Sequence, residues 1–437
     1  MIRRIFFDSE ELKITPDFKP MVSIIFWNSL GFFFFQFLIP YVTAQLLEAS
    51  GTQMGFVFAS QILGGLLSAP LVGYLTDRVS KKLLVLIGSF GRGICYILMY
   101  LGILYSSLII FALGLFIQGF FVGFFWTPID ALISQKSHKI HRSSAFGKRG
   151  GMIGKGNLVG SLISFTIFAI TVIFIPENLF LVYSPLLIFA ASNFYGGITF
   201  HRRVDEELTY DKHILNSNNY QTNEHKVKSK EKELTSSTIK SLRGFILGFS
   251  ILMITYMIIN MNQSLAQPFF QVYLIDELKI ENPVFVMIIY FPSQIISLLL
   301  APKLGNIADK VNPVLGITII SSLGSLVTWL IINSTSGLMF GIILLLDATF
   351  AWAGNLILQN VLSRLSRSHR GKIFGASQWF SLFGAIIGPI AGGFVWEYIG
   401  PRAPFIISIF VELSIIPLYI IAISILKSHM AEKLEIE

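Results

Sequence analysis

Charged residues are scarce in this chain of 437 residues. They make up 13% of it, whereas about 25% of an ordinary soluble domain is charged. Hydrophobic residues account for 53%. Because so few polar side chains cannot cover a soluble surface, the composition predicts a protein embedded in a membrane.

Several chemical groups are also missing. The one cysteine, Cys95, lies inside an apolar run, so we expect neither a disulfide nor a cysteine-based metal site. No His-Glu-x-x-His helix occurs, and no set of nucleophile and base stands out. The sequence therefore predicts no enzyme, no metal and no cofactor.

An ATP-driven pump is excluded by the absence of a phosphate-binding loop, Gly-x-x-x-x-Gly-Lys-(Ser/Thr). The nearest string, around Lys155, has Arg149 where the first glycine belongs and Gly156 where the hydroxyl residue belongs. Energy for any transport must then come from a gradient, or transport is passive.

Long apolar runs fill most of the chain, and a membrane helix needs about 20 such residues. The polar segment 201–243 lacks the apolar content to fold alone and predicts a cytoplasmic linker. It separates two sets of six runs, a bundle at 22–200 and a bundle at 244–426, with an N-terminal segment 1–21 and a tail 427–437. The runs are 22–46, 53–75, 83–105, 107–132, 149–175, 178–200, 244–272, 284–304, 314–333, 336–361, 374–397 and 403–426.

Two motifs recur at nearly the same distance. Ala-Pro-x-x-Gly ending at Gly73 recurs at Gly305, 232 residues later, and each copy continues into an acid-base pair. His-Arg-x-x-x-Phe-Gly, which begins at His141, recurs at His369, 228 residues later. The chain is therefore predicted to be one bundle of helices used twice.

Lysine and arginine gather in alternate loops, which predicts the orientation in the membrane. The N-terminal segment, the linker and the loops near Arg78, Arg142 and Arg370 are basic, whereas the opposite side has only Lys279 and Arg402. We expect a multi-pass protein of the cell membrane with both termini in the cytoplasm. The net charge of +8 is then a topology signal, and no nucleic acid is needed to explain it. Acidic residues soon after Arg3 and Arg4 argue against an export signal.

The loop after the second apolar run resembles a family signature, Gly-x-Leu-(Ala/Ser)-Asp-(Arg/Lys)-x-Gly-(Arg/Lys)-(Arg/Lys). Over nearly its whole length the chain is similar to the major facilitator superfamily of secondary transporters. It departs from the signature at Thr76 and Ser80. The matching residues are Gly73, Leu75, Asp77, Arg78, Lys81 and Lys82.

The resemblance implies an all-α membrane protein of twelve transmembrane helices in two pseudo-twofold-related six-helix bundles, working by alternating access. It also implies that Asp77 and Arg78 latch the cytoplasmic side. The alternative is a solvated turn whose charges set the topology. The residues expected to take part in gating are Gly73, Asp77, Arg78, Arg142, Asp309, Lys310 and Arg370.

Two features typical of the family's drug exporters are altered. Their Gly-Pro pattern belongs to span 5, but here Gly388-Pro389 lies in span 11. Their span 4 carries an arginine three residues before Gln-Gly, a place that Leu115 occupies here. Both changes weaken the inference that this protein is a proton-coupled drug exporter.

Asp347 lies near mid-depth of span 10, where an ionisable side chain needs a partner, a cavity or a function. Burial favours the protonated form of a carboxyl group, so Asp347 is the best candidate to carry a proton. The alternative is a carboxylate satisfied by neighbouring hydroxyls or a cation. Lys155 is expected to pair with Asp130, or else to bind an anion. For Arg92 and Glu412 we favour structural pairing over transport.

Asn260, Gln263 and Gln267 fall on one face of span 7 by their spacing, and we expect this face to line a central cavity. Amides also hold membrane helices together without binding solutes. The full set of candidate solute-binding residues is Asn28, Gln36, Gln118, Trp126, Asn260, Gln263, Gln267, Asp347, Asn355 and Gln359.

The leading hypothesis is a monomer that exports or exchanges a small organic solute across the lipid bilayer, coupled to protons at Asp347. The alternative is uptake of a polar metabolite or organic anion, read by Lys155 or Arg92. A non-transporting sensor or lipid scramblase on the same scaffold is the remaining hypothesis. The sequence leaves the solute, the coupling ion and the direction open.

Overall fold

The computed structural model describes residues 13–138, 142–210, 236–280, 282–308, 311–365, 370–428 and 430. These residues form helices joined by short loops, and a bridge between Ile14 and Ser137 is the one β pairing among them. Ten helices in the described ranges are long and apolar enough to cross a membrane. A helix suits this setting because hydrocarbon offers no partner to an unpaired backbone N–H or C=O group.

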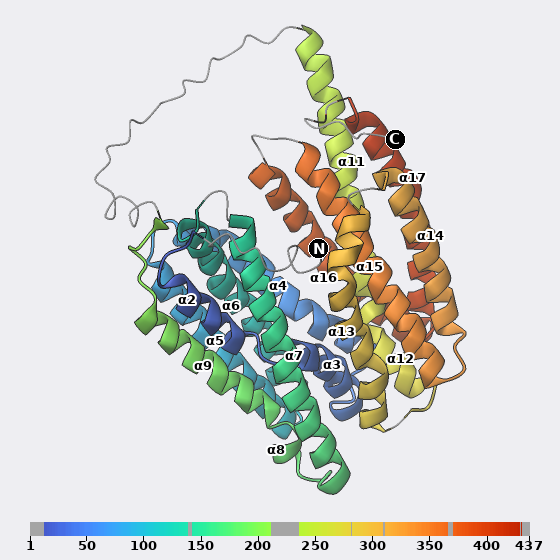
Figure 1. The fold of residues 1–437 in the computed structure, drawn as a ribbon. Helices are drawn as coiled ribbons and strands as arrows, with labels where there is room; N and C mark the ends of the chain where they lie inside the picture. Colours follow the sequence, from blue (N-terminus) through green and yellow to red (C-terminus); the bar gives the residue numbers. More distant parts are fainter. Residues whose placement is uncertain are drawn as a thin grey trace, which may run out of the picture. The chain divides into compact units, whose positions relative to one another are not determined.

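The chain forms two compact units (Figure 1). Unit 1 comprises the described residues up to Gln36 and from Leu63 to Tyr210. Its helices are α2 (Phe18–Asn28), the second half of α4 (Gly51–Thr76), α5 (Lys81–Leu104), α6 (Leu108–Gln135), α7 (Arg142–Phe174), α8 (Leu179–Val182) and α9 (Pro185–Arg203).

Unit 2 comprises residues 37–62 and the described residues from Ser236 onward. α3 (Phe32–Tyr41) begins in unit 1 and continues into unit 2, followed by the π-helical turn η1 (Val42–Leu46). The other elements are the first half of α4, α11 (Ser236–Ala266), η3 (Gln267–Phe269), α12 (Phe270–Asp276), α13 (Pro283–Ala308), α14 (Pro313–Ile332), α15 (Gly337–Leu365), α16 (Arg370–Tyr398) and α17 (Ala403–Leu426).

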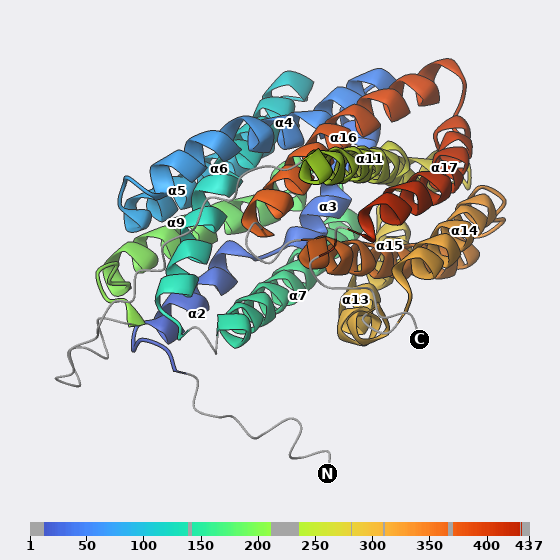
Figure 2. The same ribbon diagram turned by 90° about the horizontal axis from the view of Figure 1, so that it is seen from above.

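The order of packing is the same inside each unit. In unit 1, α2 packs against α7 and α9, and α5 packs against α6 and α9. In unit 2, α11 packs against α16 and α17, and α14 packs against α15 and α17, as Figure 2 shows. The partners correspond span by span, so the packing repeats as the duplicated motifs predict.

Glycines four residues apart bring helix backbones into contact in both units. A Cβ added at Gly384, Gly388 or Gly392 of α16 would lie within 2.4 Å of a backbone oxygen of α11. On α7, a Cβ at Gly156 or Gly160 would lie within 2.6 Å of the backbone of the first span. These glycines are required because a side chain there would push the helices apart.

The first span is interrupted, although the sequence predicts a continuous helix over 22–46. α2 ends at Asn28 and α3 starts at Phe32. Gly31 between them has φ +75°, and a Cβ there would clash with the ring of Phe189. Only glycine fits this left-handed position, which the ring of Phe189 from α9 also crowds. Of the phenylalanines that follow, Phe34 and Phe35 are buried in the packing.

The helices beside the predicted linker extend further than the apolar runs. α9 ends at Arg203, and α11 begins at Ser236 with a polar first turn. Residues 204–210 are held against the rest of unit 1 by Lys136, a fully buried side chain at the end of α6. Its ammonium group donates to Asp17 Oδ2 at 2.7 Å, to Leu208 O at 2.8 Å and to Asp205 O.

Candidate functional site

The end of α4 carries the predicted gating motif. Gly73, Asp77 and Arg78 are exposed, and the Arg78 guanidinium stacks on the Tyr74 ring, 4.2 Å from its centre, and donates to its hydroxyl. A Cβ at Gly73 would meet no atom of the described residues within 4 Å, so no helix among them packs closely against this glycine. Arg142 and Arg370 are the first residues of α7 and α16, and Asp309 and Lys310 lie outside the described residues.

Glu206 completes this end of unit 1, and the sequence analysis missed it because it lies in the predicted linker. Its carboxylate accepts hydrogen bonds from Ser80 Oγ at 2.6 Å and from the Lys81 backbone N–H at 2.8 Å, where α5 begins. Partial burial alone would raise the pKa of Glu206. The hydrogen bonds from Ser80, Lys81 and Lys82 and the Lys81 charge outweigh it, so its pKa lies below the ordinary glutamate value. The acid thus caps a helix N-terminus.

The variant Glu206→Gln is expected to lose a small, pH-dependent stabilisation. A carboxyl group whose pKa is lowered by folding stabilises the fold above its unfolded pKa, and this is lost as the pH falls through the folded value. Because the group is partly exposed to screening solvent, we expect a loss of at most about 1 kcal/mol at pH 7. The thermal unfolding midpoint at pH 7 and below about pH 4 measures it.

The neighbouring exposed acid provides the control, because Glu207→Gln removes the same charge without touching α5. Glu207→Gln should match the wild type at both pH values. A Glu206→Gln variant as stable as wild type at pH 7 would contradict the capping role.

The sequence analysis predicted that Asp130 pairs with Lys155, and this prediction is wrong. Asp130 Oδ1 lies 2.9 Å from Arg149 Nε, and the Arg149 guanidinium also lies 4.8 Å from the centre of the Trp126 ring. Lys155 is exposed on α7. Position on the helix explains the difference, because Arg149 is nearly two turns closer to the start of α7 and so meets the end of α6.

Buried polar groups collect inside unit 1 around the break in the first span. Asn28 and Gln118 are 1% and 2% exposed, and Arg92 of α5 is 5% exposed. Arg92 Nη2 donates to the Asn28 carbonyl at 2.8 Å, and Ser89 Oγ donates to Asn28 Oδ1 at 3.2 Å. Two candidate solute-binding residues, Asn28 and Gln118, therefore lie in the same buried region as a fixed positive charge.

Two acidic side chains, Glu412 and Asp347, lie close to each other inside unit 2. Glu412 of α17 accepts hydrogen bonds from Asn262 Nδ2 at 2.8 Å and from the Ser321 hydroxyl, and it interacts electrostatically with Asp347 of α15. Neither carboxyl group forms an ion pair with a basic side chain in the described ranges. Glu412 is thus held by hydrogen bonds from Asn262 and Ser321, and two acids share one apolar environment.

The amides of α11 point in more than one direction. Asn260 Nδ2 donates to Tyr256 O at 2.9 Å and to Ser381 Oγ of α16 at 3.1 Å, whereas Asn262 turns toward Glu412. Gln263 is half-buried and Gln267 is exposed. Asn260 thus joins two helices in addition to any binding role. Of the remaining candidates, Gln36, Trp126 and Asn355 are half-buried and Gln359 is exposed.

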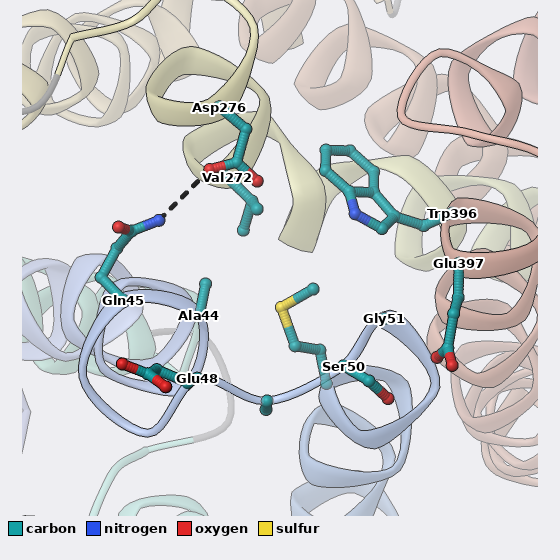
Figure 3. Close-up of a pocket in the computed structure, with 11 residues that line it drawn as sticks. Ala44, Gln45, Glu48, Ser50, Gly51, Val272, Asp276, Trp396 and Glu397 are labelled. Carbon is teal, nitrogen blue, oxygen red and sulfur yellow. Dashed lines mark hydrogen bonds between the residues drawn. The ribbon is translucent and has the colours of Figure 1, made fainter.

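A cavity of about 570 Å³ opens in unit 2 at the end where η1, α12 and α16 finish (Figure 3). Trp396 and Val272 form apolar walls. Two of its acids are held in place: Asp276 Oδ1 accepts from Gln45 at 3.4 Å, and Glu397 Oε2 accepts from the Thr52 N–H at 2.8 Å. Its rim is therefore acidic and partly ordered by the start of α4.

The comparison with protein families agrees with this architecture. The family model described as Major Facilitator Superfamily matches residues 21–366 and 252–433, which together span nearly the whole chain. The chain belongs to the major facilitator superfamily. It is a multi-pass membrane protein of a transporter family, as the motif around Asp77 predicted.

A curated relative is similar over most of both chains. The multidrug resistance protein MdtG of Yersinia enterocolitica is 26% identical over 397 residues, which are 87% of each protein. Solved structures share the fold at lower identity. A nucleoside transporter NupG superposes with a TM-score of 0.67 at 15% identity, covering 93% of this chain and 99% of that one.

A bacterial homologue of the lysosomal transporter Spinster gives a TM-score of 0.62 at 13% identity, covering 94% of this chain and 95% of that one. At such identities the likeness concerns the fold. The predicted all-α fold of this superfamily is confirmed.

Proposed function

We propose that this protein exports or exchanges a small organic solute by alternating access, with proton coupling at Asp347. The observation that carries the proposal is that Asp347 and Glu412 of unit 2 interact with each other, and that neither forms an ion pair with a basic side chain of the described residues. Two carboxylates close together in an apolar medium repel each other, so a proton shared between Asp347 and Glu412 lowers the free energy. A site that gains and loses one proton can link solute movement to a pH gradient.

The direction of transport is inferred from the relative. MdtG is described as a multidrug resistance protein and aligns with 87% of this chain, which supports expulsion of an organic compound. We further infer that the basic loops face the cytoplasm, with both termini, in a cell membrane. In that orientation the acidic cavity beside Trp396 faces outward, and Asp77 and Arg78 lie at the cytoplasmic gate. We take the monomer as the working unit.

Purified full-length protein in liposomes tests the proposal. A pH gradient is imposed, and the movement of ethidium (a cation) and benzenesulfonate (an anion) is followed. We expect the gradient to drive net movement of at least one probe, and the unlabelled form of that probe to exchange with the labelled form. If a pH gradient moves neither probe and neither exchanges, although both bind the protein, the proposal is contradicted.

A further inference from the structure

Arg92 is a positive charge buried in the middle of unit 1. It is near the centre of α5 (Lys81–Leu104), and its side chain is 5% exposed. A guanidinium group stays charged at every physiological pH, so it cannot escape the penalty of burial by losing a proton. A buried charge of this kind requires compensation from its surroundings.

Part of the compensation comes from the broken first span. α2 ends at Asn28, and the last carbonyl groups of a helix have no partner within it and carry partial negative charge. Arg92 Nη2 donates to one of them, Asn28 O, at 2.8 Å. The Phe125 ring centre lies 5.2 Å from the guanidinium carbon, and the Tyr96 side chain hydrogen-bonds with the Arg92 side chain. These contacts are all with neutral groups, so they satisfy part of the guanidinium without neutralising its charge.

The rest of the guanidinium is unsatisfied. Nε and Nη1 are buried and have no hydrogen-bond partner among the described residues. Asp130, an acid on the neighbouring helix α6, is paired with Arg149. A neighbouring donor, Asn28 Nδ2, is likewise buried without an acceptor. The unpartnered atoms on Arg92 and Asn28 are thus all hydrogen-bond donors, and a net positive charge remains.

A water molecule could accept a hydrogen bond here, but it would leave the charge in place. An anionic oxygen both accepts from the guanidinium and neutralises it, which is the interaction this group forms most strongly. We propose that Arg92 is the centre of an anion-binding subsite that takes the carboxylate or sulfonate group of the transported solute. The transport role of the bound anion rests on the proposed function, whereas its binding does not.

The position of the subsite fits a role in solute binding. Asn28 and Arg92 meet at the interruption between α2 and α3, where Gly31 adopts φ +75°. Interrupted helices at mid-membrane are a recurrent way for transporters to present polar backbone to a solute. The break thus places polar backbone beside the guanidinium in the interior of unit 1.

Direct binding to the purified full-length protein tests this inference. The probe is benzenesulfonate, and the neutral benzenesulfonamide has nearly the same shape. We expect benzenesulfonate to raise the thermal unfolding midpoint of the wild type and of Arg202→Gln, an exposed arginine on α9. The sulfonamide should have no effect. Arg92→Gln should bind benzenesulfonate at least about tenfold more weakly.

A second variant covers the case in which Arg92→Gln fails to fold. Arg92→Lys keeps the charge and one donor to Asn28 O but loses the planar fork, so its benzenesulfonate affinity should also fall while the protein remains folded. Equal protection by both probes, or unchanged affinity in Arg92→Lys, would show that Arg92 only caps α2. Equal protection by chloride alone would mean an inorganic anion and overturn the assignment to the solute.

Flux measurements separate the two proposals. If benzenesulfonate binds through Arg92 but no solute is moved by a pH gradient or exchanged, the subsite stands and the transport function fails. If solute flux is driven by the gradient yet is identical in wild type and Arg92→Lys, transport stands and the anion subsite is overturned.

Discussion

Asp347→Asn is expected to abolish solute movement driven by a pH gradient while leaving the folded protein intact. Asp347 is the eleventh residue of α15, about 15 Å from the helix start and so near the middle of a hydrocarbon core of roughly 30 Å. No basic side chain of the described residues pairs with it, and Glu412 lies close enough to interact with it. Asparagine keeps the shape and the hydrogen-bonding capacity but cannot bind and release a proton.

The measurement is transport in liposomes under two regimes. With an imposed pH gradient, Asp347→Asn should fall to the level of protein-free vesicles. Exchange of labelled for unlabelled solute needs no net proton transfer, and it should persist. Glu277→Gln, which removes an exposed acid from the same unit, is the control and should behave as wild type in both. Wild-type coupling in Asp347→Asn would remove this residue from the mechanism.

Gly388→Val is expected to prevent correct packing of unit 2. The first carbon of any side chain at this position would lie 2.4 Å from Met261 O and 2.9 Å from Ser264 Cβ on α11. Backbone atoms cannot rotate away, so the two helices must separate, and with them the contacts at Gly384 and Gly392. Overpacking of this kind costs about 1–3 kcal/mol and sometimes more.

The control lies on the same helix. A Cβ at Gly375 of α16 would meet no atom of the described residues within 4 Å, so Gly375→Val should be tolerated and should even favour the helix slightly. The yield of monodisperse protein and its thermal unfolding midpoint measure the effect. We expect the yield and the unfolding midpoint to fall sharply for Gly388→Val and to stay near the wild-type values for Gly375→Val. Equal behaviour of the two variants would mean that α11 and α16 do not depend on close backbone contact.

The fold was largely predictable because its signals are local or repeated. Each span is a long apolar run, and the motifs at Gly73 and His141 recur in the second half, so the helical membrane fold, the duplication and the family follow from the sequence. The break in the first span was missed, although Gly31 marks it. A glycine within an apolar run is compatible with a continuous helix, and only contact with Phe189 reveals the constraint.

It was harder to predict which charged side chains on different helices contact each other. The acid Asp130 was assigned to the wrong base because helix depth, rather than apolar content, decides whether Arg149 or Lys155 reaches it. Glu206 was missed because the cap of α5 comes from a residue that follows α9 along the chain. The Glu206 contacts join residues more than a hundred positions apart, and Asp130 and Arg149 lie on two different helices. Spacing along one helix carries no information about such contacts.

The sequence by itself determined that this is a helical membrane protein of the major facilitator superfamily, since apolar length and the repeated motifs depend on nothing outside each segment. Only the tertiary structure decided which buried charges are compensated. Among the described residues it pairs Asp130 with Arg149, leaves two nitrogens of Arg92 without partners and sets Asp347 beside Glu412. The physical reason is that the energy of a charge in an apolar medium depends on the atoms within a few ångströms, and these come from other helices.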